Sequence, residues 1–364
     1  MIELEKKRIT TSPQIHKPIS TAAVMWAVSA CLLPAAVWGI YSFGLRSLAV
    51  ILVTIAASVV TELVLGLVTK RFTILDGSAV LTGLLIAFNL PPGIPLYIPV
   101  VASVFAIGVV KWTFGGLGSN WMNPALAGRV FVAFSWTGPM TSWTLPRNVV
   151  DAVSSATPLS AVKSGLFTYS GSAGGPMQFL AETGYAHSAF DGKVTGLLQR
   201  ILGPIGATIE PGYGDLFFGN IPGCIGEVSA FLLLLGTIYL FARKIITWHV
   251  PVSYLATFGI LIWIFGGSRF GSGGFSGNVV FHLFSGGLIL GAFYMATDMV
   301  TTPLTAKGLL IFGIGCGFFT FLIRLFGSFP EGVSLAIILM NVFVPLINKY
   351  TGPKRFGLKK QSEE

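Results

Sequence analysis

Charged residues are scarce in this sequence. They make up 10% of its 364 residues, with 23 Lys and Arg against 14 Asp and Glu. Soluble domains carry about 25% charged residues, so a soluble globular domain is excluded. Hydrophobic residues make up 53% of the chain and fall in long runs. Because a soluble core could not bury so many apolar runs, lipid must form part of the solvent, and we predict a membrane protein.

Cysteine and histidine are also few. Cys31, Cys224 and Cys316 lie far apart, in or beside apolar runs, and the four histidines are scattered. No two cysteines have the spacing of metal ligands, and three thiols cannot supply the four that an iron–sulfur cluster requires. We therefore interpret the cysteines as small apolar side chains within helices and predict no metal site in this chain. A cluster shared with another subunit is left open.

The net charge of +9 would suggest nucleic acid as the partner of a soluble protein. Here the basic residues flank apolar segments, so the charge is a topology signal and the expected partner is membrane lipid. Segment 77–90 runs into Pro91 and Pro92, so a short, broken or tilted span is expected there. We count ten apolar segments: residues 22–41, 46–69, 77–90, 95–112, 121–137, 224–242, 250–265, 278–297, 308–326 and 332–348.

Basic residues mark alternate ends of these segments. Lys70 follows the second segment, Lys111 the fourth and Lys307 the eighth. The opposite short loops hold only three basic residues, Arg46, Arg269 and Arg324. Because positive residues mark cytoplasmic loops, both termini are predicted to lie in the cytoplasm and the long loop 138–223 outside it. This loop is rich in Gly, Ser and Thr and has no sustained helical period, which makes it a candidate functional loop.

The predicted fold is an all-α polytopic membrane protein with about ten transmembrane helices. Residues 84–88 resemble residues 288–293, which predicts two five-helix repeats, and an odd number of spans in each would make the repeats inverted. The predicted parts are a cytoplasmic tail (1–21), a first membrane half (22–137), the extracytoplasmic loop (138–223), a second membrane half (224–348) and a basic cytoplasmic tail (349–364).

The most specific motif lies near the start of the long loop. Its pattern, Asp-x-x-Ser-x-Ala-Thr, consists of Asp151, Ser154, Ala156 and Thr157. It resembles the site at which flavin transferases attach FMN through its phosphate to a Thr hydroxyl. A hydroxyl oxygen can attack a phosphoryl group to form a phosphoester, and a small Ala before the Thr leaves room for a flavin. By composition alone this stretch would be an ordinary polar loop.

Further motifs extend over nearly the whole chain. They are Thr-Ser-Pro-Gln-Ile-His (11–16), Gly-Gly-Leu-Gly-Ser-Asn (115–120), Asn-Pro-Ala (123–125), Ala-Thr-Asp-Met-Val-Thr-Thr-Pro (296–303) and Pro-Glu-Gly (330–332). In this order they resemble the NqrB/RnfD family. The short N-terminal tail is more similar to the RnfD branch than to NqrB.

The resemblance implies a membrane subunit of an Rnf-type complex in the bacterial cytoplasmic (inner) membrane. Such complexes move electrons between ferredoxin and NAD and couple this transfer to Na⁺ or H⁺ translocation. The expected cofactor is FMN joined to Thr157, and a second, noncovalent flavin such as riboflavin is left open. The expected partners are RnfA, RnfB, RnfC, RnfE and RnfG, with a flavin transferase for maturation. The chain would be part of an oxidoreductase, with no catalytic residue assigned to it.

Two alternatives stay open from the residues. The chain could be the NqrB-like subunit of a Na⁺-pumping NADH:quinone reductase. A more distant alternative is a secondary transporter without a redox cofactor, in which case the match at Asp151–Thr157 is due to chance.

The ionisable residues within or beside apolar segments include Glu62, Asp76, Arg129 and Asp298. Such residues often mark ion paths or binding partners. Arg129 is expected to extend toward the cytoplasmic surface, where Asp76 would be hydrated. We single out Glu62 and Asp298 for a role in ion movement or packing.

Overall fold

The computed structural model describes residues 20–146, 156–165, 174–185, 187–202, 204, 210–227, 229–329 and 331–352. All regular secondary structure within these ranges is helical. Asp151 and Ser154 of the predicted flavin motif lie outside the described residues.

Five long apolar helices could each cross a membrane: α1 (Thr21–Phe43), α2 (Leu45–Thr69), α12 (His249–Phe265, extended as an apolar helix to Ser268), α15 (Ala306–Phe326) and α16 (Val333–Thr351). Their outward-facing side chains are apolar; on α2, for example, Leu52, Val60 and Leu67 are each more than half exposed. Apolar exposure on this scale is typical of a helix in lipid. The chain is therefore a multi-pass membrane protein, whereas the count of ten spans and the inverted repeat remain predictions.

Four shorter apolar helices accompany them: α3 (Ser78–Phe88), α4 (Tyr97–Val104), which continues into the π-helix η2 (Phe105–Trp112), α5 (Pro124–Ser135) and α11 (Ala230–Ala242). The short helix expected before Pro91 is confirmed, because α3 ends at Phe88. The eighth predicted segment, 278–297, is not a continuous helix. It forms α13 (Val279–Phe284), then α14 (Leu288–Leu290) and the π-helix η5 (Gly291–Met295), with a break at residues 285–287.

Two segments meet inside the molecule: the end of α3 with the residues that follow it, and the chain at Ile225 and Gly226 before α11. The carbonyl groups of Phe88 and Leu90, at the end of α3, accept hydrogen bonds from the backbone N–H groups of Gly226 and Ile225 at 3.0 and 3.1 Å. Gly226 is required for this approach, since a Cβ atom there would collide with the ring of Phe88. Backbone groups at membrane depth need such partners, so irregular chain is stable here only because the two segments pair.

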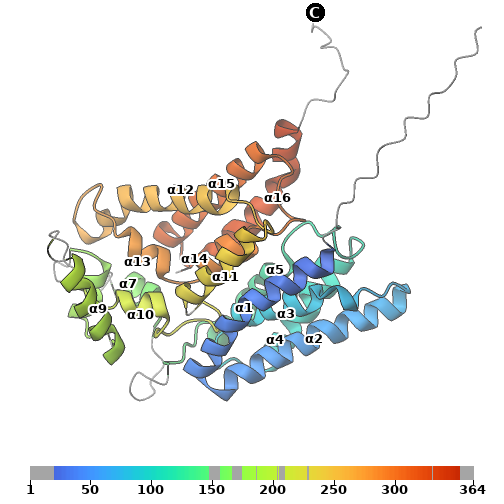
Figure 1. Ribbon diagram of the computed structural model, residues 1–364, viewed down its shortest axis with the longest axis horizontal. Helices are drawn as coiled ribbons and strands as arrows, with labels where there is room; N and C mark the ends of the chain where they lie inside the picture. The colour runs from blue at the N-terminus through green and yellow to red at the C-terminus, as the bar shows by residue number, and fades with distance from the viewer. Residues whose placement is uncertain are drawn as a thin grey trace, which may run out of the picture.

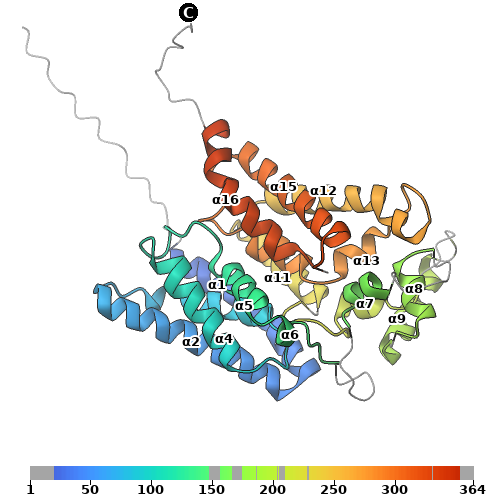
Figure 2. The same cartoon turned by 180° about the vertical axis from the view of Figure 1, so that it is seen from behind.

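The helices form two groups that pack side by side. Figures 1 and 2 show α1 to α5 on one side and α11 to α16 on the other. Helix α1 contacts α11, and α5 contacts α16, so the interface between the groups runs along two helix pairs.

The long loop contains helices that the sequence pattern did not predict. They are α6 (Thr137–Met140), α7 (Pro158–Gly165), α8 (Pro176–Glu182), α9 (Ala189–Leu202) and α10 (Tyr213–Phe218). The expectation of no helical period was wrong, because most of these helices are only one to two turns long and their flanking Gly, Ser and Thr hid them. Helices α7, α8 and α10 share a small core with α13: Leu159, Val162, Met177, Phe179, Leu180, Leu216, Ile221 and Phe281. Figure 1 shows α7 to α10 at the end of the molecule opposite the start of α1 and the end of α16.

Candidate functional site

Thr157 directly precedes α7 and has the hydrogen bonds of a helix N-cap. Its carbonyl oxygen accepts a bond from Ala161 N at 2.8 Å. Its Oγ1 accepts a bond from Ser160 N at 3.2 Å and lies 2.8 Å from Ser160 Oγ. Free N–H groups and the helix dipole favour an anion at this position. A phosphate on Thr157 would therefore meet hydrogen-bond donors and a favourable field.

The motif suggested an open polar loop, but the side chain of Thr157 is buried. Thr157 is 6% exposed, whereas Ala156 is exposed and its carbonyl accepts a bond from Tyr185 Oη at 3.0 Å. Thr157 opens into a small cavity. Its other lining residues are Pro158, Ile221, Pro222, Gly223, Glu227, Gly286 and Glu331. The predicted attachment residue thus lies beside two carboxylic acids that the sequence pattern did not assign to the site.

These acids belong to a buried charged cluster between the two helix groups. Arg129, on α5, donates to Glu331 and to Ser334 at the start of α16, and a guanidinium nitrogen lies 3.5 Å from Glu227 Oε1. The expectation for Arg129 was wrong: its side chain is 11% exposed and joins the two groups instead of reaching the cytoplasmic surface. One signal could have revealed Glu227, because an acidic residue beside an apolar segment usually has a function or a partner.

A second arginine, Arg324, stabilises the break at residues 285–287 in the eighth predicted segment. Arg324 was expected in a short loop, but it lies in the last turn of α15 and is 4% exposed. Its guanidinium donates to the carbonyl groups of Ser285 and Glu331, both at 3.3 Å, and of His282, and it lies 5.0 Å from the ring centroid of Phe258. These bonds satisfy carbonyl groups that the interrupted helix leaves free.

An apolar pocket lies against the buried charged cluster that contains Arg129 and Glu331. Its wall includes Arg129, Glu331 and the aromatic side chains of Phe134, Trp143 and Phe329. Because Glu331 also lines the Thr157 cavity, the charged cluster borders both spaces.

A larger pocket lies in the other part of the membrane region, between both helix groups. Ligand pockets usually combine apolar walls with a few polar groups. Here the polar groups include Lys111, Asn120, Asn123 and Asp298. Asn120 is 6% exposed, and its Oδ1 has no hydrogen-bond donor in the described part of the chain. This pocket could therefore bind a flat polar ligand with an N–H group.

Glu62 lies close to this pocket and is paired. Its Oε2 is 2.6 Å from Lys111 Nζ, which also lies 2.6 Å from Ser78 Oγ, and its Oε1 accepts a bond from Thr73. Asp298 accepts bonds from its own turn, at Val300 N and Thr301 Oγ1. Both residues therefore have packing partners, and a role in ion movement remains a prediction for each.

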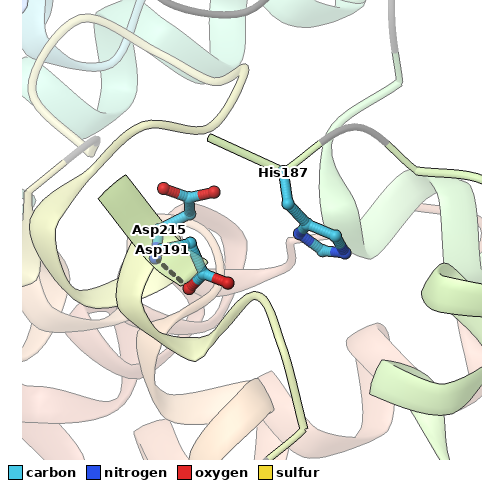
Figure 3. A group of neighbouring side chains, drawn as sticks. All are labelled: His187, Asp191 and Asp215. Carbon is cyan, nitrogen blue, oxygen red and sulfur yellow. Dashed lines mark hydrogen bonds between the residues drawn. The ribbon is translucent and has the colours of Figure 1, made fainter. Parts of the chain in front are cut away.

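The part of the chain that contains α9 and α10 holds a third group, His187, Asp191 and Asp215 (Figure 3). Each residue offers a ligand atom within 4.8 Å of the others. Asp191 accepts bonds from Gly212 N and Asp215 N, and Asp215 accepts a bond from Ser188 N at 2.7 Å. Because these carboxylates already fix backbone N–H groups, we assign them to the structure of α9 and α10.

Comparison with known proteins identifies the family. A model of the NQR2, RnfD, RnfE family matches residues 8–357. The chain belongs to this family. It is 44% identical over 354 residues to a subunit of the proton-translocating ferredoxin:NAD(+) oxidoreductase complex of Clostridium ljungdahlii, covering 97% of this chain and 96% of the relative. It is 42% identical over 357 residues to a subunit of the Na(+)-translocating ferredoxin:NAD(+) oxidoreductase complex of Acetobacterium woodii, covering 98% and 97%.

Four of the five stretches that resembled the NqrB/RnfD family contribute to the sites described above, and the fifth, residues 11–16, lies outside the described residues. Asn120 and Asn123 line the larger pocket together with Asp298, from a stretch far away in sequence. Glu331 joins the cluster beside Thr157. Residues from the stretches that resembled the family therefore lie at two sites, one near each end of the membrane helices.

Proposed function

We propose that this chain is the RnfD-type membrane subunit of an ion-translocating ferredoxin:NAD oxidoreductase, and that it relays electrons through FMN joined to Thr157. The full-length similarity to two subunits of such complexes carries the first part of the proposal. Neither the quinone reductase nor the transporter alternative is favoured by the names of these relatives. One relative is named for protons and the other for Na⁺, so the similarity does not choose the ion.

The position of Thr157 supports the covalent flavin. Its Oγ1 would carry the phosphoester, and Ser160 N and Oγ would donate to the phosphate oxygens. When bound, FMN supplies the capacity to accept and pass on electrons. The aromatic pocket beside Arg129 offers an apolar seat for its ring system. We assign the NAD and ferredoxin sites to partner subunits such as RnfB and RnfC.

A second, noncovalent flavin is proposed for the larger pocket. The unpaired Asn120 Oδ1 would accept a bond from a ring N–H, and Lys111 Nζ would donate to a ring carbonyl. The walls contributed by residues such as Leu85 and Phe293 suit an aromatic ring system.

The covalent flavin is tested by fluorescence of the denatured, gel-separated protein after co-expression with a flavin transferase. Fluorescence is expected from the wild type and none from Thr157→Val, which has no hydroxyl to carry the phosphoester. Thr183→Val is the matched control, because Thr183 only bonds carbonyl groups of α8, Phe179 and Leu180, and it should remain fluorescent. Fluorescence that persists in Thr157→Val would show that the flavin is attached elsewhere.

The noncovalent flavin is measured in the supernatant after acid precipitation of the same proteins. Thr157→Val should still release flavin into the supernatant, whereas Asn120→Leu should release much less and keep its in-gel fluorescence. Normal release from Asn120→Leu would exclude this pocket as the second flavin site.

A further inference from the structure

Two carboxylic acids from distant segments meet beside Thr157. One oxygen of Glu227, one oxygen of Glu331 and the Sγ of Cys224 all lie within 4.8 Å of one another. The side chains of Glu227 and Glu331 are 2% and 10% exposed. Both line the Thr157 cavity, so any charge on a flavin attached there acts on them directly.

The two acids have unequal partners. Glu331 receives a guanidinium hydrogen bond from Arg129. Neither oxygen of Glu227 accepts a hydrogen bond from the described part of the chain, and the guanidinium nitrogen of Arg129 is 3.5 Å away. A buried carboxylate without a donor is costly, and a neighbouring carboxylate raises this cost. A proton shared by the pair, residing mainly on Glu227, removes both penalties.

The surrounding groups set the charge of the site. Arg129 approaches from α5 and Arg324 from α15, while Cys224 contributes a buried thiol, which burial keeps neutral. His282, on α13, presents its carbonyl group to Arg324. Lys163, on α7, donates to the carbonyl groups of Arg324 and Phe329 nearby and is a further cation whose charge is constant through the step. For the two acids and the two guanidinium groups alone, one proton on the acids leaves one net positive charge next to the cavity. Without that proton, the group is neutral.

We propose that Glu227 and Glu331 form a proton-binding pair whose occupancy is linked to the redox state of the flavin on Thr157. This inference rests on the proposed function. When one electron arrives from a one-electron donor in a neighbouring protein of the complex, it adds one negative charge beside the pair. Where the pair of the oxidised site has lost its proton, the site with the added electron binds a proton more tightly, so one O–H bond forms on Glu227 with a proton taken up from the solvent. Loss of the electron reverses the step and releases the proton.

Linkage makes this coupling reciprocal: if the electron favours the proton, the proton raises the midpoint potential of the flavin by the same free energy. The potential should therefore fall as pH rises through the titration of the pair. For one proton per electron, a tenfold change in proton concentration shifts the potential by up to about 59 mV.

The first test is a potentiometric titration of the covalent flavin in the assembled complex at several pH values. The midpoint potential of the wild type should fall as pH rises, and that of Glu227→Gln, which cannot lose a proton, should fall much less. Glu227→Asp should restore the wild-type dependence of the potential on pH. Glu182→Gln, which changes an exposed carboxylate on α8, should keep the wild-type slope. An equal slope in wild type and Glu227→Gln would overturn the proposal.

The second test does not need the flavin. Infrared spectra of wild-type protein produced without a flavin transferase should contain the carbonyl stretch of a buried protonated carboxylic acid. This band should titrate with pH in the wild type and be lost in Glu227→Gln. No titrating band in the wild type would overturn the proton pair, even if Glu227→Gln did not assemble. If the band is present but wild-type protein co-expressed with an active flavin transferase carries no covalent flavin, the proposed function is refuted instead.

The proton is distinguished from a metal cation by repeating the titration at fixed pH in Na⁺ and in K⁺. The proposal expects the same potential in both salts. A potential that follows Na⁺ and not pH would overturn the assignment of the proton and make the pair a Na⁺ site.

Discussion

The ion pair of Glu62 with Lys111 illustrates how a single contact stabilises the membrane region at the residue scale. The pair is fully buried, and both side chains have a second hydrogen-bond partner, Thr73 for Glu62 and Ser78 for Lys111. A buried pair of this kind adds little net stability compared with apolar residues, but removal of one partner leaves an uncompensated charge.

Lys111→Met is therefore expected to lower the free energy of unfolding by about 3–5 kcal/mol. The double variant Lys111→Met/Glu62→Gln should recover most of this loss, because no buried charge remains unpaired. Thermal unfolding in detergent measures both. Lys307→Met, which removes an exposed lysine at the start of α15, should change stability by less than about 0.5 kcal/mol. A double variant no more stable than Lys111→Met would show that the pairing is not what Lys111 contributes.

The sequence reveals unusual residues more readily than it reveals the residues with which they pair. Glu62 could be singled out because an acidic residue within an apolar run is unusual, and Thr157 because its motif is specific. Lys111 was interpreted as a surface residue, because its partner is 49 positions away and they meet only when η2 packs on α2. Arg129 and Glu331 are 202 positions apart and could not be paired from one sequence.

At the scale of elements, the break between α13 and α14 brings backbone close to the carboxyl pair. Gly286 has φ 69°, a left-handed conformation that favours glycine, and Arg324 satisfies the freed carbonyl of Ser285. Gly287 keeps an ordinary φ of −78°, but a Cβ atom there would collide with Oε1 of Glu227. The absence of a side chain at Gly287 therefore leaves room for this carboxyl group.

Gly287→Ala is expected to displace Glu227 and to lower the free energy of unfolding by about 1–3 kcal/mol, the usual cost of overpacking. Gly108→Ala is the control, because a Cβ atom there has no neighbour within 4 Å and alanine suits a helix. Unfolding in detergent measures stability, and the pH slope of the flavin potential, reduced only in Gly287→Ala, measures the displacement. Equal stability of the two variants would mean that Glu227 moves aside without cost.

Helix positions could be predicted better than helix breaks. The range 22–41 became α1 (Thr21–Phe43), because a long apolar run leaves no other structure possible in lipid. The end of α3 was foreseen because Pro91 and Pro92 cannot continue a helix. The break at residues 285–287 carries only small residues, and the carbonyl groups it frees find their donor in Arg324, which no local pattern reveals.

At the scale of the whole molecule, the start of α1 and the end of α16 lie at the opposite end of the membrane region from the helices α7 to α10 (Figure 1). The basic residues of the sequence predict that the termini lie in the cytoplasm. The flavin on Thr157 and its proton pair would then lie at the outer side, and the larger pocket at the inner side. Electrons that pass between them would then cross the membrane.

This orientation is testable because all three native cysteines are buried and should react little with a maleimide. Lys193→Cys places an exposed thiol on α9, and Lys307→Cys places one at the start of α15. A membrane-impermeant maleimide is added to cells whose outer envelope is permeable and whose cytoplasmic membrane is intact. It should label Lys193→Cys and not Lys307→Cys, and both variants should react after lysis. The reverse pattern would place α7 to α10 and Thr157 in the cytoplasm, and the pair of Glu227 and Glu331 would then exchange its proton with the cytoplasm instead of the outside.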